Sequence, residues 1–168
     1  YCESHSKGTS WSLELPEKLC GWILSNSPKL WDCPPLDTVN LKNGLLDVRA
    51  RSLRAHDPEF LSPIQIEASF NPSAECPAIE KFIADTFPDD ARHIPYEIAA
   101  WLMLPDTSLQ KAVLAVGEGS NGKSVFLTLL GDFLGKENLS AVDLHKIEAD
   151  KFAAARLYGK LANICADL

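Results

Sequence analysis

The stretch "KAVLAVGEGSNGKSVFLTLL", residues 111–130, decides the fold that the sequence predicts. Its short apolar run, 112–116, contains two valines and ends at a glycine, which is typical of a strand buried on both faces. Residues 124–135 then repeat apolar side chains at helical spacing, and Gly135 fits a helix end. The sequence therefore predicts that residues 117–124 form the turn from a buried strand into a helix.

The turn has the spacing of a phosphate-binding loop, Gly117-x-x-x-x-Gly122-Lys123-Ser124. Glycines let backbone N–H groups approach a phosphate, and a helix N-terminus adds partial positive charge. A lysine can reach the β- and γ-phosphates, and a serine hydroxyl can bind Mg²⁺. ATP is thus expected at a loop of eight residues: Gly117, Glu118, Gly119, Ser120, Asn121, Gly122, Lys123 and Ser124. The alternative is a glycine-rich turn that binds nothing.

A second carboxylate is expected where another buried strand ends, because such a group holds Mg²⁺ opposite the loop. The run "KLANICADL", 160–168, offers Asp167 directly after apolar residues. Ser124 and Asp167 are therefore the candidate metal ligands, and Lys123 and Asp167 the candidate catalytic residues. The alternative is that Asp167 only caps a following helix. Residues 139–144 and 145–159 leave room for a strand and a helix between the two halves of the site.

The first half of the chain alternates between strand and helix patterns. Strands are expected at 37–42, 45–48 and 52–55, with turns at Asn43-Gly44 and 49–51 and a further strand at 64–66. Residues 11–31 predict a short amphipathic helix, in which packing of Trp11, Trp22 and Trp31 in a core is favoured over stacking on bases. Residues 78–87 and 94–104 have helical spacing, punctuated by Pro88 and Pro105.

Composition restricts the class of protein. An apolar content of 46% and a charged content of 23% fit a globular chain, and no apolar run reaches the ~20 residues of a membrane span. The net charge of −7 argues against one broad basic face on duplex DNA. The basic side chains of residues 42–54 favour a solvated strand face over a DNA-contact patch. Five cysteines without repeated spacing argue against a disulfide framework and indicate a reducing compartment.

Four tracts together resemble the phage and plasmid primase-helicases, superfamily III helicases related to the poxvirus primase-helicase. They are "VNLKNGLLDVRARSLRAHDPEF" (39–60), "FNPSAECPAIEKFI" (70–83), "GEGSNGKS" (117–124) and "LYGKLANICADL" (157–168). The resemblance covers roughly residues 35–168. Asn121 before Gly122-Lys123-Ser124 is part of what separates this group from other phosphate loops.

The resemblance implies an AAA+-like ATPase that forms a ring, expected to be a hexamer, and translocates on single-stranded DNA in replication of a mobile element. It implies ATP and Mg²⁺ as cofactors, the cytoplasm of a bacterial host as the location, and a primase domain as a possible upstream neighbour. The family's sensor asparagine and arginine finger are expected beyond Leu168. Many relatives carry a glutamate at or beside position 167, so Asp167 leaves the general base unassigned.

These expectations define an α/β chain. Residues 1–75 form a small mixed α+β domain, and residues 76–168 form a helical linker and the first part of a P-loop ATPase domain with a mostly parallel sheet, ending at the strand before Asp167. The resemblance also implies that the strands at 112–116 and 161–166 are not adjacent, which leaves an exposed apolar edge. Loader, packaging or kinase-type P-loop enzymes, and a non-catalytic oligomerisation or docking module, remain the alternatives.

Overall fold

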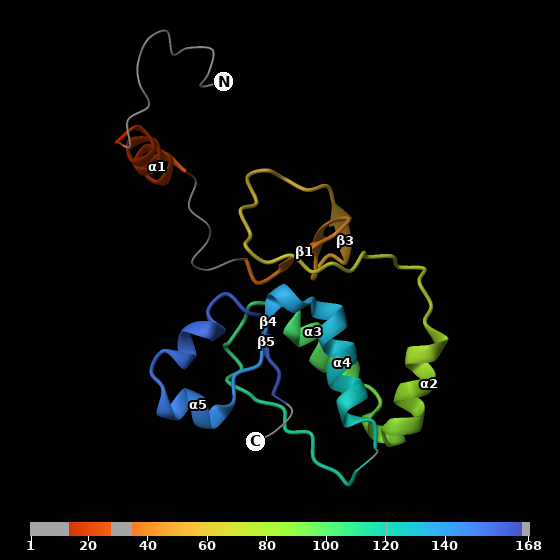
Figure 1. Cartoon of the computed structure of the whole chain (residues 1–168). Helices are drawn as coiled ribbons and strands as arrows, with labels where there is room; N and C mark the ends of the chain where they lie inside the picture. Colours follow the sequence, from red (N-terminus) through yellow and green to blue (C-terminus); the bar gives the residue numbers. More distant parts are fainter. Residues whose placement is uncertain (1–13, 28–34, 120, 166–168) are drawn as a thin grey trace. The chain divides into compact units, whose positions relative to one another are not determined.

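The computed structural model of the chain describes residues 14–27, 35–119 and 121–165, and groups the chain into two compact units, residues 1–30 and 31–168 (Figure 1). The elements in chain order are α1 (Glu14–Asn26), β1 (Thr38–Leu41), β2 (Gly44–Asp47), β3 (Ser52–Arg54), α2 (Pro77–Thr86), η1 (Asp89–Ala91), α3 (Ile94–Leu102), α4 (Lys123–Leu134), η2 (Lys136–Asn138), β4 (Leu139–Ser140), α5 (Leu144–Ala149), η3 (Ala153–Leu157) and β5 (Ala162–Asn163). The fold is mixed α+β with small sheets.

The first unit contributes one described helix, α1, as the apolar spacing predicts. Its last turn is closed by side chains, since Ser25 Oγ donates to the carbonyl of Gly21 and Asn26 Nδ2 donates to that of Trp22, both at 2.8 Å. The expected core position of Trp22 is wrong, because this side chain is 65% exposed. Among residues 14–27, the described part of this unit, there is no second element against which α1 could bury a face. Trp11 and Trp31 lie outside the described residues.

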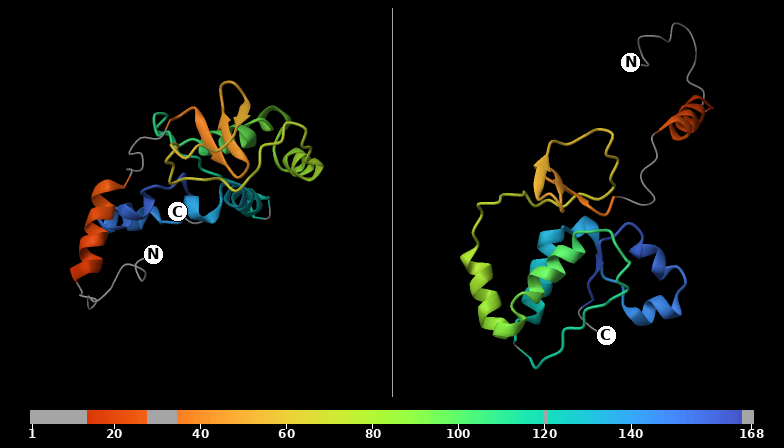
Figure 2. Two further views of the ribbon diagram at one scale, coloured as in Figure 1. Left: turned by 90° about the horizontal axis from the view of Figure 1, so that it is seen from above. Right: turned by 180° about the vertical axis from the view of Figure 1, so that it is seen from behind.

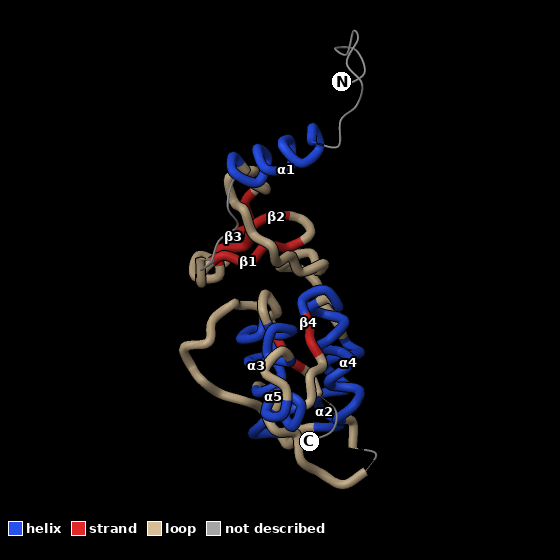
Figure 3. The backbone as a smooth tube through the Cα atoms, turned by 60° about the vertical axis from the view of Figure 1, so that its left-hand side comes forward, coloured by secondary structure: helices blue, strands red, loops and turns tan. Residues whose placement is uncertain are grey.

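The three strands expected in the first half form an antiparallel sheet in the order β1-β2-β3 (Figure 3). Leu41 pairs with Gly44, so the two-residue turn is Lys42-Asn43, one residue earlier than expected. Gly44 is required at the start of β2, because a Cβ there would lie 2.4 Å from the carbonyl oxygen of Arg54 on β3. The expected extra strand is reduced to one parallel bridge, between Ile66 and Leu41.

The core of the second unit joins this sheet to the C-terminal end of α4. Its buried members are Val39, Leu41, Leu46, Ile66 and Leu134. Partly buried side chains from the end of α3, from β4 and from β5 pack on this cluster, including Leu102, Leu139 and Ala162. Residues 36–75 therefore share their core with the later half of the chain. The domain boundary expected at residue 75 stays a prediction.

Helices α2, α3 and α4 confirm the three helical patterns expected between 78 and 135. Within the second unit, α3 and α4 lie between α2 on one side and α5 on the other (Figures 1 and 2). The rings of Phe87 and Phe126 meet edge to face, with centroids 5.5 Å apart, and join the end of α2 to the start of α4. Gly135 ends α4 at φ +85°, as expected.

The parallel part of the fold is smaller than expected. β4 and β5 form a two-stranded parallel pair, with Leu139 opposite Ala162. The expected strand at 112–116 is wrong: these residues form no strand, and Val113, Leu114 and Val116 are 54%, 64% and 82% exposed. No backbone hydrogen bond links 112–116 to another described segment. Because residues 112–116 form no strand, the expected separation of two strands within one sheet and its exposed apolar edge stay predictions.

The described part of the chain lacks a membrane-spanning helix and a metal-binding cluster. None of its helices combines the length and the apolar character needed to cross a membrane. Cys20 and Cys76 are free thiols, and the described residues contain no cluster of His, Cys, Asp or Glu side chains arranged to hold a metal.

Candidate nucleotide-binding site

The glycine loop leads into α4 through Gly122, which has a left-handed backbone (φ +82°). A Cβ at this position would also lie 2.9 Å from Cγ2 of Thr86 at the end of α2. Both observations demand glycine. The N-terminus of α4 has no side-chain cap, so the N–H groups of its first turn are available to an anion.

Lys123 is folded back over the loop that precedes it. Its ammonium group donates to the carbonyl oxygens of Gly117 (2.7 Å) and Glu118 (2.9 Å) and to Oδ1 of Asn121 (2.7 Å). These three bonds match the three donors of an ammonium group. The loop thus holds a positive charge at its own centre, beside the start of α4. A ligand phosphate would have to replace at least one of these acceptors.

The side chain of Asn121 packs against Gly117 within the loop and accepts a hydrogen bond from Lys123. A Cβ on Gly117 would lie 2.1 Å from Nδ2 of Asn121 and 3.5 Å from Nζ of Lys123. The absent side chain at Gly117 therefore makes the space in which the Asn121 amide orients the lysine. By contrast, nothing lies within 4 Å of a Cβ on Gly119. The spacing of the motif does not distinguish these two glycines, but their surroundings do.

Of the expected metal ligands, the structure places only Ser124. This residue is exposed in the first turn of α4, and its carbonyl accepts a hydrogen bond from Thr128 Oγ1 at 2.8 Å. Among the described residues its hydroxyl has no hydrogen-bond partner. Asp167 and Ser120 lie outside the described residues, so the structure brings together Gly117, Glu118, Asn121, Gly122 and Lys123, and their role in nucleotide binding stays a prediction.

The strand that leads toward Asp167 is held by an asparagine that sequence reasoning missed. Asn163 Oδ1 accepts from the Val142 amide (2.8 Å) and from Ser140 Oγ (2.9 Å), and its Nδ2 donates to the Val142 carbonyl (2.9 Å). The amide thus fixes β5 to the segment after β4. No periodicity in the sequence marks Asn163, because its partners lie 21 and 23 residues away.

Asn138 is the second missed residue and the only buried polar side chain among the described residues, at 4% exposed. Its side-chain Nδ2 donates to the backbone carbonyls of Gln65 and Leu134, both at 2.7 Å. The backbone carbonyl of Asn138 accepts a hydrogen bond from the Leu161 amide at 2.8 Å. One residue therefore ties the segment before Ile66, the end of α4 and the start of β5. This network fixes the helix whose other end carries the glycine loop.

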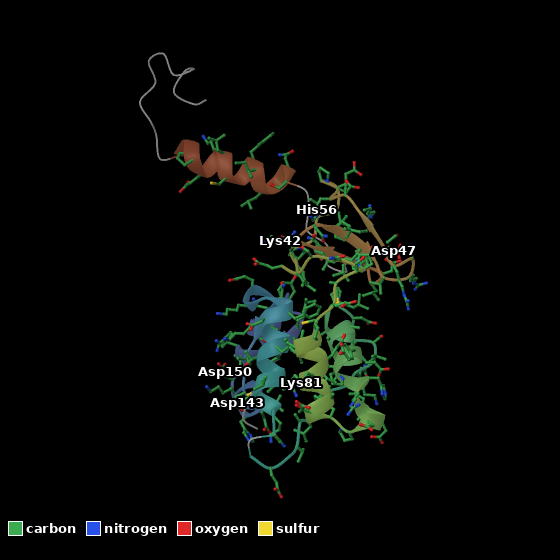
Figure 4. The ribbon with its side chains drawn as sticks, turned by 90° about the vertical axis from the view of Figure 1, so that its right-hand side faces the viewer. Lys42, Asp47, His56, Lys81, Asp143 and Asp150 are labelled. Atoms are coloured by element: carbon green, nitrogen blue, oxygen red, sulfur yellow. The ribbon has the colours of Figure 1, made fainter. Side chains whose placement is uncertain are left out.

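The basic residues of the β1–β3 region are exposed but interspersed with acids. Arg54 lies 3.9 Å from Asp57, and its guanidinium lies 5.9 Å from the centroid of the Phe60 ring. The His56 ring lies near the turn at Lys42, with Nε2 3.3 Å from the Lys42 carbonyl oxygen, while Asp47 lies at the far end of β2 (Figure 4). DNA contact at this cluster stays a prediction.

Comparisons with known families match the two halves of the chain separately. Residues 13–88 match the family model described as D5 N terminal like, and residues 115–168 match a family of unknown function (DUF5906). Each match covers less than half of the chain. The first supports the resemblance to phage and plasmid primase-helicases, since that domain is found in such proteins. No curated protein matches the chain.

Proposed function

We propose that the chain is part of an ATP-dependent DNA helicase of superfamily III that acts in replication of a phage, plasmid or other mobile element. The observation that carries the proposal is the glycine loop at the N-terminus of α4, with Lys123 gathered at its centre. The match of residues 13–88 to the D5 N terminal like family supports the connection to replication. A ring of subunits, most simply a hexamer, and the cytoplasm of a bacterial host belong to the same proposal.

The residues of the loop fit a nucleoside triphosphate. The Asn121 amide occupies the space beside Gly117 and Thr86 that beside Gly122, so only glycine allows the loop its tight turn into α4. A phosphate is a stronger acceptor for an ammonium group than the neutral carbonyls that Lys123 now contacts. Lys123 can therefore exchange these contacts for β- and γ-phosphate oxygens while the first turn of α4 contributes its N–H groups.

The bound Mg²⁺ would neutralise phosphate charge, and the residues proposed to hold it are Ser124 and Asp167. The Ser124 hydroxyl suits this role, because it is exposed and has no competing partner among the described residues. The general base that activates water is not assigned within the chain. Single-stranded DNA is the proposed track of the motor.

The test is ATP hydrolysis by the full-length protein, which is expected to include the arginine finger, with and without a single-stranded oligonucleotide, in the wild type, Lys123→Ala and Lys146→Ala. Lys146 is an exposed lysine of α5 and serves as the matched control for loss of one charge. Hydrolysis that DNA stimulates, and that only Lys123→Ala abolishes, supports the proposal. Hydrolysis that ignores DNA would favour a loader, packaging or kinase-type enzyme and would contradict translocation.

A further inference from the structure

A second surface lies in the segment of residues 151–160, "KFAAARLYGK", here called the aromatic–basic segment. It contains η3 and follows α5, on the side of the second unit opposite α2 (Figure 1). Phe152 and Tyr158 are 71% and 84% exposed, more than any other aromatic side chain that the structure describes. Two large rings left in water call for an explanation.

Phe152 lies directly before η3 and Tyr158 directly after it. Each of the amides of Ala153, Ala155 and Tyr158 donates to the carbonyl three residues earlier, at 2.9–3.3 Å. At the 3₁₀ rise of ~2 Å per residue, η3 separates the backbones of Phe152 and Tyr158 by about 12 Å along its axis. Ala155, midway between them in sequence, is small and exposed. The two rings are therefore accessible at the two ends of η3.

Positive charge is interleaved with these rings. Lys151, Arg156 and Lys160 are the only charged residues of the segment. The Lys151 ammonium lies 5.2 Å from the centroid of the Phe152 ring, and Lys160 donates to a backbone carbonyl, that of Glu137, at 2.5 Å. Within the described part of the chain, no ion pair neutralises Lys151 or Arg156.

Two acids before the segment accept backbone hydrogen bonds, whereas a third, Glu148 on α5, is exposed. Asp143 and Asp150 flank α5 (Figure 4), where their carboxylates accept from the amides of His145 at 2.7 Å and Phe152 at 2.9 Å. Asp150 in particular fixes the start of η3 through the backbone of Phe152. The segment thus combines ordered backbone, exposed rings and cations that have no carboxylate partner.

We propose that the aromatic–basic segment binds single-stranded DNA, with bases stacked on Phe152 and Tyr158 and phosphates bound by Lys151 and Arg156. Stacking on aromatic side chains beside a basic groove is the general mode of binding unpaired strands. Duplex bases are paired and stacked on each other, so the rings discriminate against duplex DNA. This inference rests on the proposed function, to which it adds a specific contact surface.

The test is the fluorescence anisotropy of a labelled 20-nucleotide oligo-dT, titrated with the chain. Phe152→Ala and Tyr158→Ala should each weaken binding about 5- to 150-fold, the range of one lost base stack. Tyr96→Ala, at an aromatic ring that is 50% exposed on α3, should leave the affinity unchanged within about twofold. Replacing both Lys151 and Arg156 by Ala should flatten the slope of log affinity against log salt by about 1.4.

Photocrosslinking shows directly which residues contact the oligonucleotide, which a loss of affinity caused only by altered folding would not show. With 5-iododeoxyuridine in the oligonucleotide, crosslinks should map to the peptide that contains Phe152 or Tyr158. Unchanged affinity in both ring variants, crosslinks elsewhere, or no binding of single strands by the wild type would each overturn the inference. If the wild type still binds ATP through Lys123 in those cases, the proposed nucleotide site stands and only this surface is wrong. Loss of ATP binding in the wild type would instead contradict the proposed function.

Discussion

The C-terminal end of α4 is buried, whereas one face of its N-terminal end is open to solvent. Leu130 and Leu134 are 5% and 0% exposed, while in the first turn Val125 is 58% exposed next to the buried Phe126. The buried end is surrounded by the β1–β3 core and by the Asn138 network. The open end follows the glycine loop and residues 112–116, which form no helix or strand.

This difference shows how one helix can serve two purposes. Tight packing at one end sets the position of the helix, because core side chains tolerate little displacement. The other end keeps its N–H groups and Lys123 accessible, as a site for a charged ligand requires. Mutations at the two ends should therefore separate stability from binding.

The largest effect is expected at the buried end. Leu134→Ala should lower the free energy of unfolding by about 2–5 kcal/mol, because it opens a cavity beside Val39, Leu41 and Ile66. Chemical denaturation checks this value. Leu144→Ala, at a leucine that is 54% exposed on α5, is the control and should change stability by less than about 0.5 kcal/mol. Equal effects of the two variants would contradict the assignment of the core.

A smaller loss is expected when the amide that fixes the buried end is removed. Asn138→Ala leaves the carbonyls of Gln65 and Leu134 without their donor, which should cost about 1–3 kcal/mol. Ser124→Ala at the open end should cost less than about 0.5 kcal/mol, since no described residue bonds its hydroxyl. Thermal unfolding measures the stability of both variants. A larger loss of stability in Ser124→Ala than in Asn138→Ala would contradict the role assigned to the Asn138 amide.

The open end should show its own contrast between two glycines. Gly122→Ala should destabilise the chain by about 1–3 kcal/mol, because it combines φ +82° with a contact of 2.9 Å to Thr86. Gly119→Ala, with open space around its Cβ position, should change stability little. Urea denaturation measures both. A destabilised Gly119→Ala beside a neutral Gly122→Ala would mean that the loop has a different conformation.

The smallest effect concerns the approach to the open end. The Ser108 backbone N–H and hydroxyl, each 2.8 Å from a carboxylate oxygen of Asp106, hold the pKa of Asp106 below its ordinary value of 3.8. This contribution to stability is present above that ordinary value and is lost as pH falls through the lowered pKa. Ser108→Ala should raise the pKa only part of the way, because the backbone bond, the larger cause, remains. Carbon-13 NMR titration measures the pKa of Asp106. An unchanged pKa in Ser108→Ala would exclude the hydrogen bond from the Ser108 hydroxyl to Asp106.

Local patterns predicted local structure well. The alternation around residues 42–51 predicted β1, β2 and β3, and helical spacing predicted α2, α3 and α4, because each depends on neighbours in sequence. The strand expected at 112–116 failed, since an apolar run cannot specify which strand will pair with it. Asn138 was invisible for the same reason, because its partner Gln65 is 73 residues away.

The candidate functional residues likewise include some that local sequence patterns predicted and some that depend on the surrounding structure. The glycine and lysine spacing of residues 117–124 is a local signal, and the structure adds why Gly117 and Gly122 have no side chain. The exposure of Phe152 and Tyr158 depends on what surrounds them, so their alternation with basic residues was visible in the sequence but their accessibility was not.

The most direct test of the central claim is calorimetric titration of the chain with ATP and Mg²⁺. The account predicts saturable binding to the wild type and to Lys146→Ala. It predicts binding about 10- to 150-fold weaker in Lys123→Ala, the loss of one charge-assisted contact to phosphate. Wild-type affinity in Lys123→Ala, or no binding by the wild type, would contradict a nucleotide site at the start of α4.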